Sequence, residues 1–286
     1  MEANPLTTLH MAIDREERDP REIENVLMPI QEAFRESTET GVAVAKKQLR
    51  ELTRGKDTDP ELAAFVAGKL NLASYDIPQE LQGEWETTLG EAFMYGGKEG
   101  NDFLDNAADK YSELATHARE RLPEDIDTIP DDEKPRELSD FFHARDRQGD
   151  VTFLSGDFEA AVSAYQLAVE SRGKFASQEP GPVACAIYGE GAALFMQGKV
   201  NEALECIEQA RNLLKEKKDE DVLTGNINNL ETAAMALDEL DPAVREERLA
   251  SMKAILKQNG GSGGGVKRID FNKLFTEAEE AENIEV

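Results

Sequence analysis

Apolar residues recur at intervals of three and four positions along most of the chain, which is the spacing of one face of an α-helix. The pattern covers four early segments, 21–37, 42–52, 59–70 and 103–122. In the third segment, Asp59 precedes Pro60, the order of an N-cap followed by proline in a first helical turn. Pro29 lies inside the first segment and is expected to kink or split that helix. No segment alternates apolar and polar residues long enough to predict a strand, so we expect an all-α protein.

A repeat follows in the second half of the chain. Two stretches, 142–175 and 184–217, carry the same small and apolar residue types at a constant offset of 42 positions. The matched pairs are Gly149 with Gly191, Gly156 with Gly198, Phe158 with Val200, Ala161 with Ala203, Tyr165 with Ile207 and Ala168 with Ala210. A constant offset over six pairs indicates that both stretches fold in the same way.

Each copy of the repeat predicts two helices joined by a tight turn. Gly156 and Gly198 fall between two apolar stripes, where a residue without a Cβ atom can take the positive φ of a turn. Gly149 and Gly191 fall inside the first stripe, where the missing side chain lets the two helices approach closely. Because one pair cannot bury both of its faces, we expect neighbouring pairs to stack.

This pattern resembles the tetratricopeptide repeat (TPR), W-x2-L-G-x2-Y followed by G-x-Y/F-x2-A-x3-Y/F-x2-A, with a usual period of ~34 residues. The longer offset in this chain predicts lengthened helices. A weaker copy within 83–115 contains Trp85, Leu89, Gly90 and Phe93, followed by Leu104, Ala107, Tyr111 and Leu114. The resemblance implies a protein that is not an enzyme, whose stacked first helices line a concave groove for a segment of a partner.

On these grounds the chain divides into six parts. They are an N-terminal helical region (1–120), a proline- and acid-rich loop (121–137), two TPR-like repeats (138–218), C-terminal capping helices (219–259), a linker (260–265) and a tethered segment (266–286). The expected architecture is a stack of antiparallel helix pairs, a TPR-like α-solenoid, with flanking helices at both ends.

The linker, Gly260 to Gly265, consists of five glycines and Ser262. Such a sequence behaves as flexible coil. A bare Gly/Ser run in a chain otherwise poor in glycine is typical of an engineered fusion, with a natural linker as the alternative. The segment behind it is then either a partner's peptide or a piece of the protein's own chain, rejoined after a loop was removed.

The tethered segment carries the pattern of a helix that binds in a groove. Phe271, Leu274, Phe275 and Ala278 lie at i, i+3, i+4 and i+7, and Asp270 can cap the helix. We expect the segment to dock on this chain or on a neighbouring copy. The expected anchors are Ile269, Phe271, Leu274 and Phe275, with the basic residues Lys267 and Arg268 in front of them.

The chain is strongly acidic, with 59 Asp and Glu against 32 Lys and Arg and a formal net charge of −27. This sign disfavours nucleic acid and anionic membranes as partners and favours basic proteins, although solubility alone or salt adaptation would produce the same excess. The two cysteines are too few for a disulfide scaffold and fit a reducing compartment. No apolar run reaches the length of a membrane span, so we expect a cytoplasmic protein, with the nucleus as the alternative.

Four residues in first-helix positions of the repeats are candidates for partner binding: Asp146, Arg147, Asp150 and Tyr188. Asp146 and Asp150 are one helical turn apart and share a face, so a groove lined by them would favour a basic segment. The alternative is that both are solvated surface charges. The basic clamp that some TPR proteins use for acidic tails is not expected, because only Arg147 could contribute to it.

No catalytic or metal-binding motif is found in the sequence. His10, His117 and His143 lie far apart, and none belongs to an HExxH or Cys/His zinc arrangement. We therefore expect no cofactor, metal or small-molecule substrate. The sequence predicts a non-enzymatic module that captures a peptide segment of a partner. It would be either an assembly chaperone for a basic client or a scaffold or adaptor subunit of a signalling, transport or secretion complex.

Overall fold

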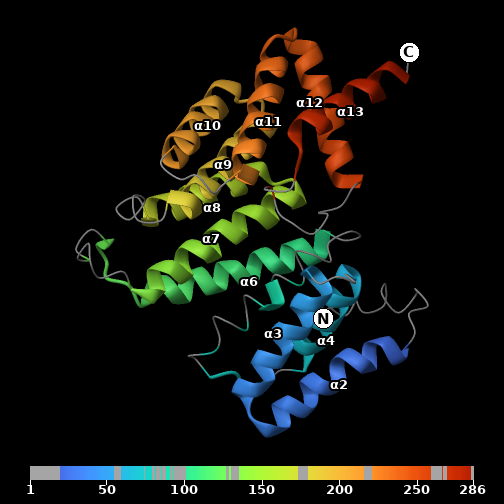
Figure 1. The fold of residues 1–286 in the computed structure, drawn as a ribbon, viewed down its shortest axis with the longest axis vertical. Helices are drawn as coiled ribbons and strands as arrows, with labels where there is room; N and C mark the ends of the chain where they lie inside the picture. Colours follow the sequence, from blue (N-terminus) through green and yellow to red (C-terminus); the bar gives the residue numbers. More distant parts are fainter. Residues whose placement is uncertain are drawn as a thin grey trace, which may run out of the picture. The chain divides into compact units, whose positions relative to one another are not determined.

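The computed structural model describes residues 20–54, 59–73, 75–78, 81, 85, 88–90, 92, 101–126, 129, 135–172, 180–215, 221–258, 266 and 269–284. Over these ranges the chain is helical and contains no strand, which confirms the all-α prediction (Figure 1). The chain divides into two compact units. The first comprises residues 1–114 with 261–263, and the second comprises residues 115–260 with 264–286. The expected linker, 260–265, lies outside the described residues.

The first unit begins with three helices, α2 (Pro20–Glu36), α3 (Thr38–Arg54) and α4 (Pro60–Leu72). α3 packs on both α2 and α4. The predicted cap of α4 is confirmed, because the Leu62 amide donates to Asp59 Oδ1 at 2.9 Å. The predicted split of α2 is wrong, since one helix runs through Pro29. A proline removes one helical hydrogen bond, and here the buried Ile30 and Ala33 continue the apolar face beyond it.

The weaker repeat copy places a glycine against an aromatic ring of the next helix, as the first of the two stronger copies does. A Cβ atom at Gly90 would lie 2.9 Å from Tyr111 Cε2, on α6 (Asn101–Glu120). Trp85, Leu89 and Leu114 are buried as well. The glycine therefore makes room for an aromatic ring of the following helix, although Phe93 and the side chain of Ala107 lie outside the described residues.

The second unit contains the repeat in the predicted form. Its helices are α7 (Arg136–Ser155), α8 (Phe158–Arg172), α9 (Pro180–Met196), α10 (Val200–Leu214), α11 (Asp221–Asp238), α12 (Pro242–Gln258) and α13 (Phe271–Ile284). α7 packs on α8 and α9 on α10, while α8 also packs on α9, so adjacent helices form stacked pairs. Gly156 and Gly198 follow the first helix of each pair with φ of 91° and 79°, which confirms the predicted turns.

A single tyrosine joins three helices of this stack. A Cβ atom at Gly149 of α7 would lie 2.6 Å from Tyr165 Cε1, and one at Gly189 of α9 would lie 2.5 Å from Tyr165 Cζ. The ring of Tyr165, on α8, is therefore held between two helix backbones that lack side chains at those points. In the second repeat, a Cβ atom at Gly191 would lie 3.0 Å from the Cβ of Cys206.

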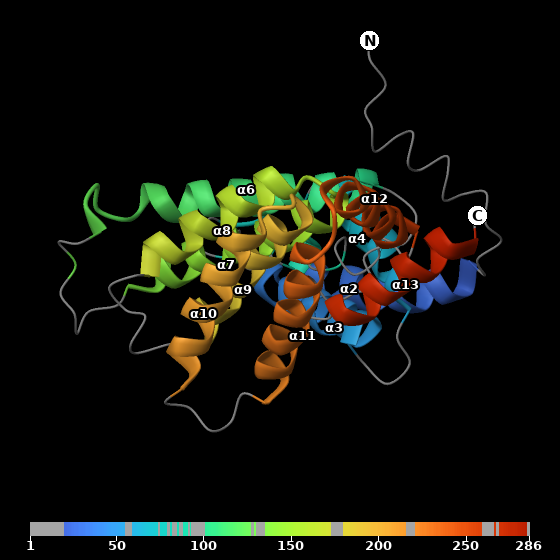
Figure 2. The ribbon, with the colours of Figure 1, turned by 90° about the horizontal axis from the view of Figure 1, so that it is seen from above.

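The last two helices before the linker, α11 and α12, do not repeat the packing of the two earlier helix pairs. α11 packs on α10 and buries one apolar stripe, which comprises Leu223, Ile227, Leu230, Ala233, Ala234 and Leu237. α12 contacts α7 and α13 as well as α11. Leu249 of α12 faces Gly198, and Lys253 Nζ lies 5.7 Å from the centre of the Phe158 ring. α12 therefore lies along the turns of both repeats, and α13 lies beside α12 and α11 (Figure 2).

Candidate peptide-binding site

The tethered segment folds into the predicted helix. The Lys273 amide donates to Asp270 Oδ1 at 3.0 Å, so Asp270 caps the first turn of α13. The four predicted stripe positions all lie on its buried side, and they are Phe271, Leu274, Phe275 and Ala278. Asn272, Thr276 and Glu280 face away and are exposed. The helix therefore presents one apolar face to the rest of the second unit.

Phe271 is the most enclosed residue of this face, with 0% of its side chain exposed. Its ring meets Phe153 of α7 edge-on at 6.2 Å between centroids and Phe195 of α9 at 5.8 Å. Phe153 and Phe195 are 42 positions apart, so they are equivalent residues of the two repeats. The socket is thus built by repetition, and each wall places a ring edge against a ring face, the geometry that aromatic pairs prefer.

Arg248 of α12 contacts α13 at Phe275 and Glu279. Its guanidinium lies 4.7 Å from the centre of the Phe275 ring, and its Nη2 lies 3.6 Å from Glu279 Oε1. Only 5% of the Arg248 side chain is exposed. One buried cation therefore contacts an aromatic face and a carboxylate of the same helix, four residues apart.

The residues in front of α13 also reach the core. Val266 is fully buried in the same apolar cluster as Phe271, and Ile269 packs against that cluster. The Ile269 amide donates to the Val266 carbonyl at 3.1 Å, which forms a turn ahead of the helix. Lys267 and Arg268, the predicted basic anchors, lie outside the described residues.

Tyr188, a predicted partner-binding residue, lies in α9 within the same cluster as Phe271. It is fully buried, and its hydroxyl has no hydrogen-bond partner within the part of the chain that the structure describes. Burial raises the pKa of Tyr188 well above its usual range, and the nearby Asp270 and Cys185 raise it further. The structure therefore brings Tyr188 together with the capping residue of α13.

Asp146 and Asp150 are buried, with 5% and 0% of the residue exposed, so the alternative of solvated surface charges is wrong. The Tyr165 hydroxyl donates to Asp150 Oδ1 at 2.8 Å, and Arg147 Nη1 lies 3.1 Å from Asp150 Oδ2. Burial raises the pKa of Tyr165, and the charges of Asp150 and Asp146 raise it further. Asp150 therefore belongs to a buried polar network between α7 and α8. This network can form because Gly149 leaves room for the ring of Tyr165.

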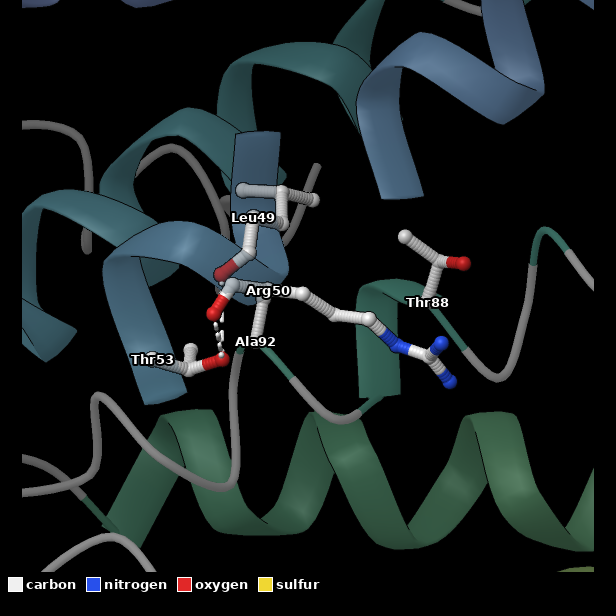
Figure 3. A pocket seen from close by; sticks show the side chains of 5 residues that line it. All are labelled: Leu49, Arg50, Thr53, Thr88 and Ala92. Atoms are coloured by element: carbon white, nitrogen blue, oxygen red, sulfur yellow. Dashed lines mark hydrogen bonds between the residues drawn. The ribbon is translucent and has the colours of Figure 1, made fainter. Parts of the chain in front are cut away.

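A separate cavity lies in the first unit, lined by Leu49, Arg50, Thr53, Thr88 and Ala92 (Figure 3). Its volume is about 10 Å³, which is room for about one water molecule. The Thr53 hydroxyl donates to the Leu49 carbonyl at 3.0 Å and so is already satisfied. This cavity is too small for an organic ligand.

The described part of the chain contains no group of three or more His, Cys, Asp or Glu side chains arranged to hold a metal ion. Cys185 and Cys206 are both free thiols. Burial raises the pKa of the Cys206 thiol to about 12, and neighbouring glutamates, Glu190 first among them, add to the shift. A thiol held neutral in this way is a poor nucleophile.

Sequence reasoning missed three residues of the site: Phe153, Phe195 and Arg248. The two phenylalanines carried a usable signal, because they obey the same 42-residue offset and each lies three positions before a turn glycine. Arg248 carried none, since its role depends on how α12 crosses the ends of the repeats. The fold and the site together define an all-α helical protein with stacked helix pairs that buries an amphipathic helix of its own chain.

No protein-family model matches the chain, and no curated protein or solved structure matches it either. Of the helices within the described ranges, none has both the length and the apolar character needed to cross a membrane.

Proposed function

We propose that this chain is a non-enzymatic, TPR-like protein-binding module that captures a short amphipathic helix of a partner protein. The observation that carries the proposal is the enclosure of Phe271 between Phe153 and Phe195. Equivalent positions of successive repeats form the walls of this socket. An anchor from a single short helix fills it, as in helix-in-groove recognition.

The energetics support recognition by a few anchors. Burying a phenylalanine side chain contributes roughly 1.5–3 kcal/mol, and the segment buries two phenylalanines with Leu274 between them. A handful of enclosed aromatic residues typically dominates such an interface. A Gly/Ser tether adds an effective concentration in the millimolar range, which raises the bound fraction above what the anchors alone would give. We propose that residues 266–286 stand in the place of the partner's segment, joined through an engineered linker.

For the partner, we propose a basic client protein and the role of an assembly chaperone in the cytoplasm or nucleus. The net charge of −27 supports this, because a large acidic excess attracts basic proteins over long range. The second candidate is a scaffold or adaptor subunit of a signalling, transport or secretion complex. It is favoured by the apolar character of the four stripe residues of α13, whose burial does not depend on the charge of the client.

Cutting the tether tests the proposal on the intact protein. A protease site placed between residues 260 and 265 would be cleaved after purification, followed by gel filtration and native mass spectrometry. We expect the fragment 266–286 to remain bound to the body. Replacing both Phe271 and Phe275 by Ala removes about 3–5 kcal/mol per residue, so we expect that fragment to separate.

The matched control replaces Asn272 and Glu280, which are exposed on the same helix, by Ala. This fragment should be retained like the unmodified one. A body that unfolds once the fragment leaves would overturn the proposal, because α13 would then be part of the core rather than a ligand. Separation of the unmodified fragment at micromolar concentration would overturn it equally.

A further inference from the structure

We infer that Arg248 is a specificity-determining residue of this site, which selects a ligand helix carrying an aromatic residue followed four positions later by a carboxylate. The inference rests on the proposed function and narrows the partner to a helix of the form D-F-x-x-L-F-x-x-A-E, as Asp270 to Glu279 present it. Such a helix has an acidic cap, three apolar anchors, a small residue and one acid.

The position of Arg248 carries this inference. Its side chain is 5% exposed although it bears a full charge, and a charge at that depth is costly unless it is compensated. The guanidinium lies 4.7 Å from the centre of the Phe275 ring and its Nη2 lies 3.6 Å from Glu279 Oε1, so two side chains of the ligand helix provide compensation. Residues four apart lie on the same face of a helix, which lets one planar cation contact both.

Guanidinium chemistry explains why an arginine suits this task. A planar guanidinium stacks on an aromatic face while its edge donates to a carboxylate, which the compact ammonium of lysine cannot do at once. Glu279 is 55% exposed, so the ion pair is partly screened and the ring contact provides the larger share. Leucine at position 275 would fill the same space but would leave the guanidinium without its ring.

Arg245, on the same helix, provides a matched comparison. Its Nη2 lies 3.2 Å from Asp238 Oδ1 and donates to the Asp238 carbonyl at 2.7 Å, so it ties α12 to the end of α11. Among the described residues, its side-chain ion pair and hydrogen bonds are made to Asp238 and Leu240, and none is made to α13. Arg245, which stabilises the fold, and Arg248, which we propose recognises the ligand helix, thus lie three residues apart on α12.

The test measures amide hydrogen exchange of α13 in the full chain, for Arg248→Met and Phe275→Leu alone and together. We expect Arg248→Met to raise the exchange rates of α13 about tenfold in the unmodified chain, and less than about threefold when residue 275 is Leu. Glu279→Gln should raise them about twofold. Arg245→Met should leave the ratio of α13 exchange to α9 exchange unchanged.

The outcomes distinguish failure of the proposed function from failure of the role proposed for Arg248. Unprotected α13 amides in the unmodified chain would overturn the proposed function itself. A protected α13 whose exchange responds equally to Arg248→Met with Phe or with Leu at position 275 would overturn only the role of Arg248. If Arg248→Met unfolds the unit, Arg248→Lys replaces it in the same cycle, with an expected increase of about threefold. An unchanged rate for that variant would also overturn the inference.

Discussion

At the scale of single residues, Tyr165 connects three helices of the second unit. Its ring occupies space that Gly149 and Gly189 leave open, and its hydroxyl donates to the buried Asp150 at 2.8 Å. The hydrogen bond fixes the ring in place, so the ring cannot move aside for a larger neighbour. The two glycines are therefore required by packing rather than by backbone conformation, since the positive φ values described belong to Gly156 and Gly198.

Gly149→Ala tests this packing. Its new Cβ atom would lie 2.6 Å from Tyr165 Cε1, and we expect a loss of about 1–3 kcal/mol in the free energy of unfolding. Gly225→Ala in α11 is the control, because its new Cβ would meet no described atom within 4 Å beyond its chain neighbours and the adjoining helix backbone. That change should stabilise the chain by about 0.5–1 kcal/mol through helix propensity. Urea unfolding followed by circular dichroism measures both, and equal effects of the two changes would contradict the packing account.

At the scale of elements, α13 is a short helix whose first turn is capped by the side chain of Asp270. Asp270 accepts the Lys273 amide hydrogen bond through Oδ1, and its carbonyl accepts the Leu274 amide at 2.9 Å. A helix of 14 residues is marginal in isolation, so capping and packing together must hold it. The charge of Asp270 also adds to the effect of burial in raising the pKa of the core residue Tyr188.

Removing the cap should loosen α13 without removing its anchors. Asp270→Ala deletes the acceptor, and we expect a cost of about 1 kcal/mol, seen as roughly fivefold faster amide exchange in the first turn of α13. Asp270→Asn keeps an acceptor oxygen and should change the rates less than about threefold. Faster exchange with Asn equal to that with Ala would show that the charge matters, rather than the cap.

The sequence predicted elements well where one local pattern decides the structure. The 42-residue offset identified the helix pairs α7/α8 and α9/α10, and Gly156 and Gly198 marked their turns. The stripe from Phe271 to Ala278 indicated which face of α13 would be buried. The turn glycines and the stripe lie within a single helix or helix pair, and the offset compares two such pairs. In each case local residue spacing determines which positions share a face.

The remaining features depend on contacts between distant segments. Nothing local distinguishes the buried Asp150 from an exposed aspartate, because its burial follows from the approach of Tyr165, 15 positions later. The role of Arg248 likewise depends on the path of α12 across the repeat turns. At Pro29, a local rule predicted a kink or a split. The helix is not split, because the apolar face of α2 continues past the proline.

At the scale of the whole molecule, the net charge of −27 predicts a response to salt, whereas the apolar socket predicts little response. Raising the ionic strength from about 0.1 M to about 1 M shortens the Debye length from about 10 Å to about 3 Å, which weakens repulsion among the excess carboxylates. We therefore expect the midpoint of urea unfolding to rise with added NaCl.

The docking of α13 should respond differently, because its principal contacts are those of Phe271 with Phe153 and Phe195. Burial of apolar surface does not weaken when charges are screened. We expect the amide exchange of α13 to change less than about threefold over the same salt range, measured relative to α9. A steep loss of α13 protection would mean instead that charge holds the segment, and would favour capture of a basic client by electrostatic attraction over the anchor mechanism. If the apolar anchors determine binding, the acidic surface would attract a basic partner towards the chain. The aromatic socket would then determine which segment of that partner remains bound.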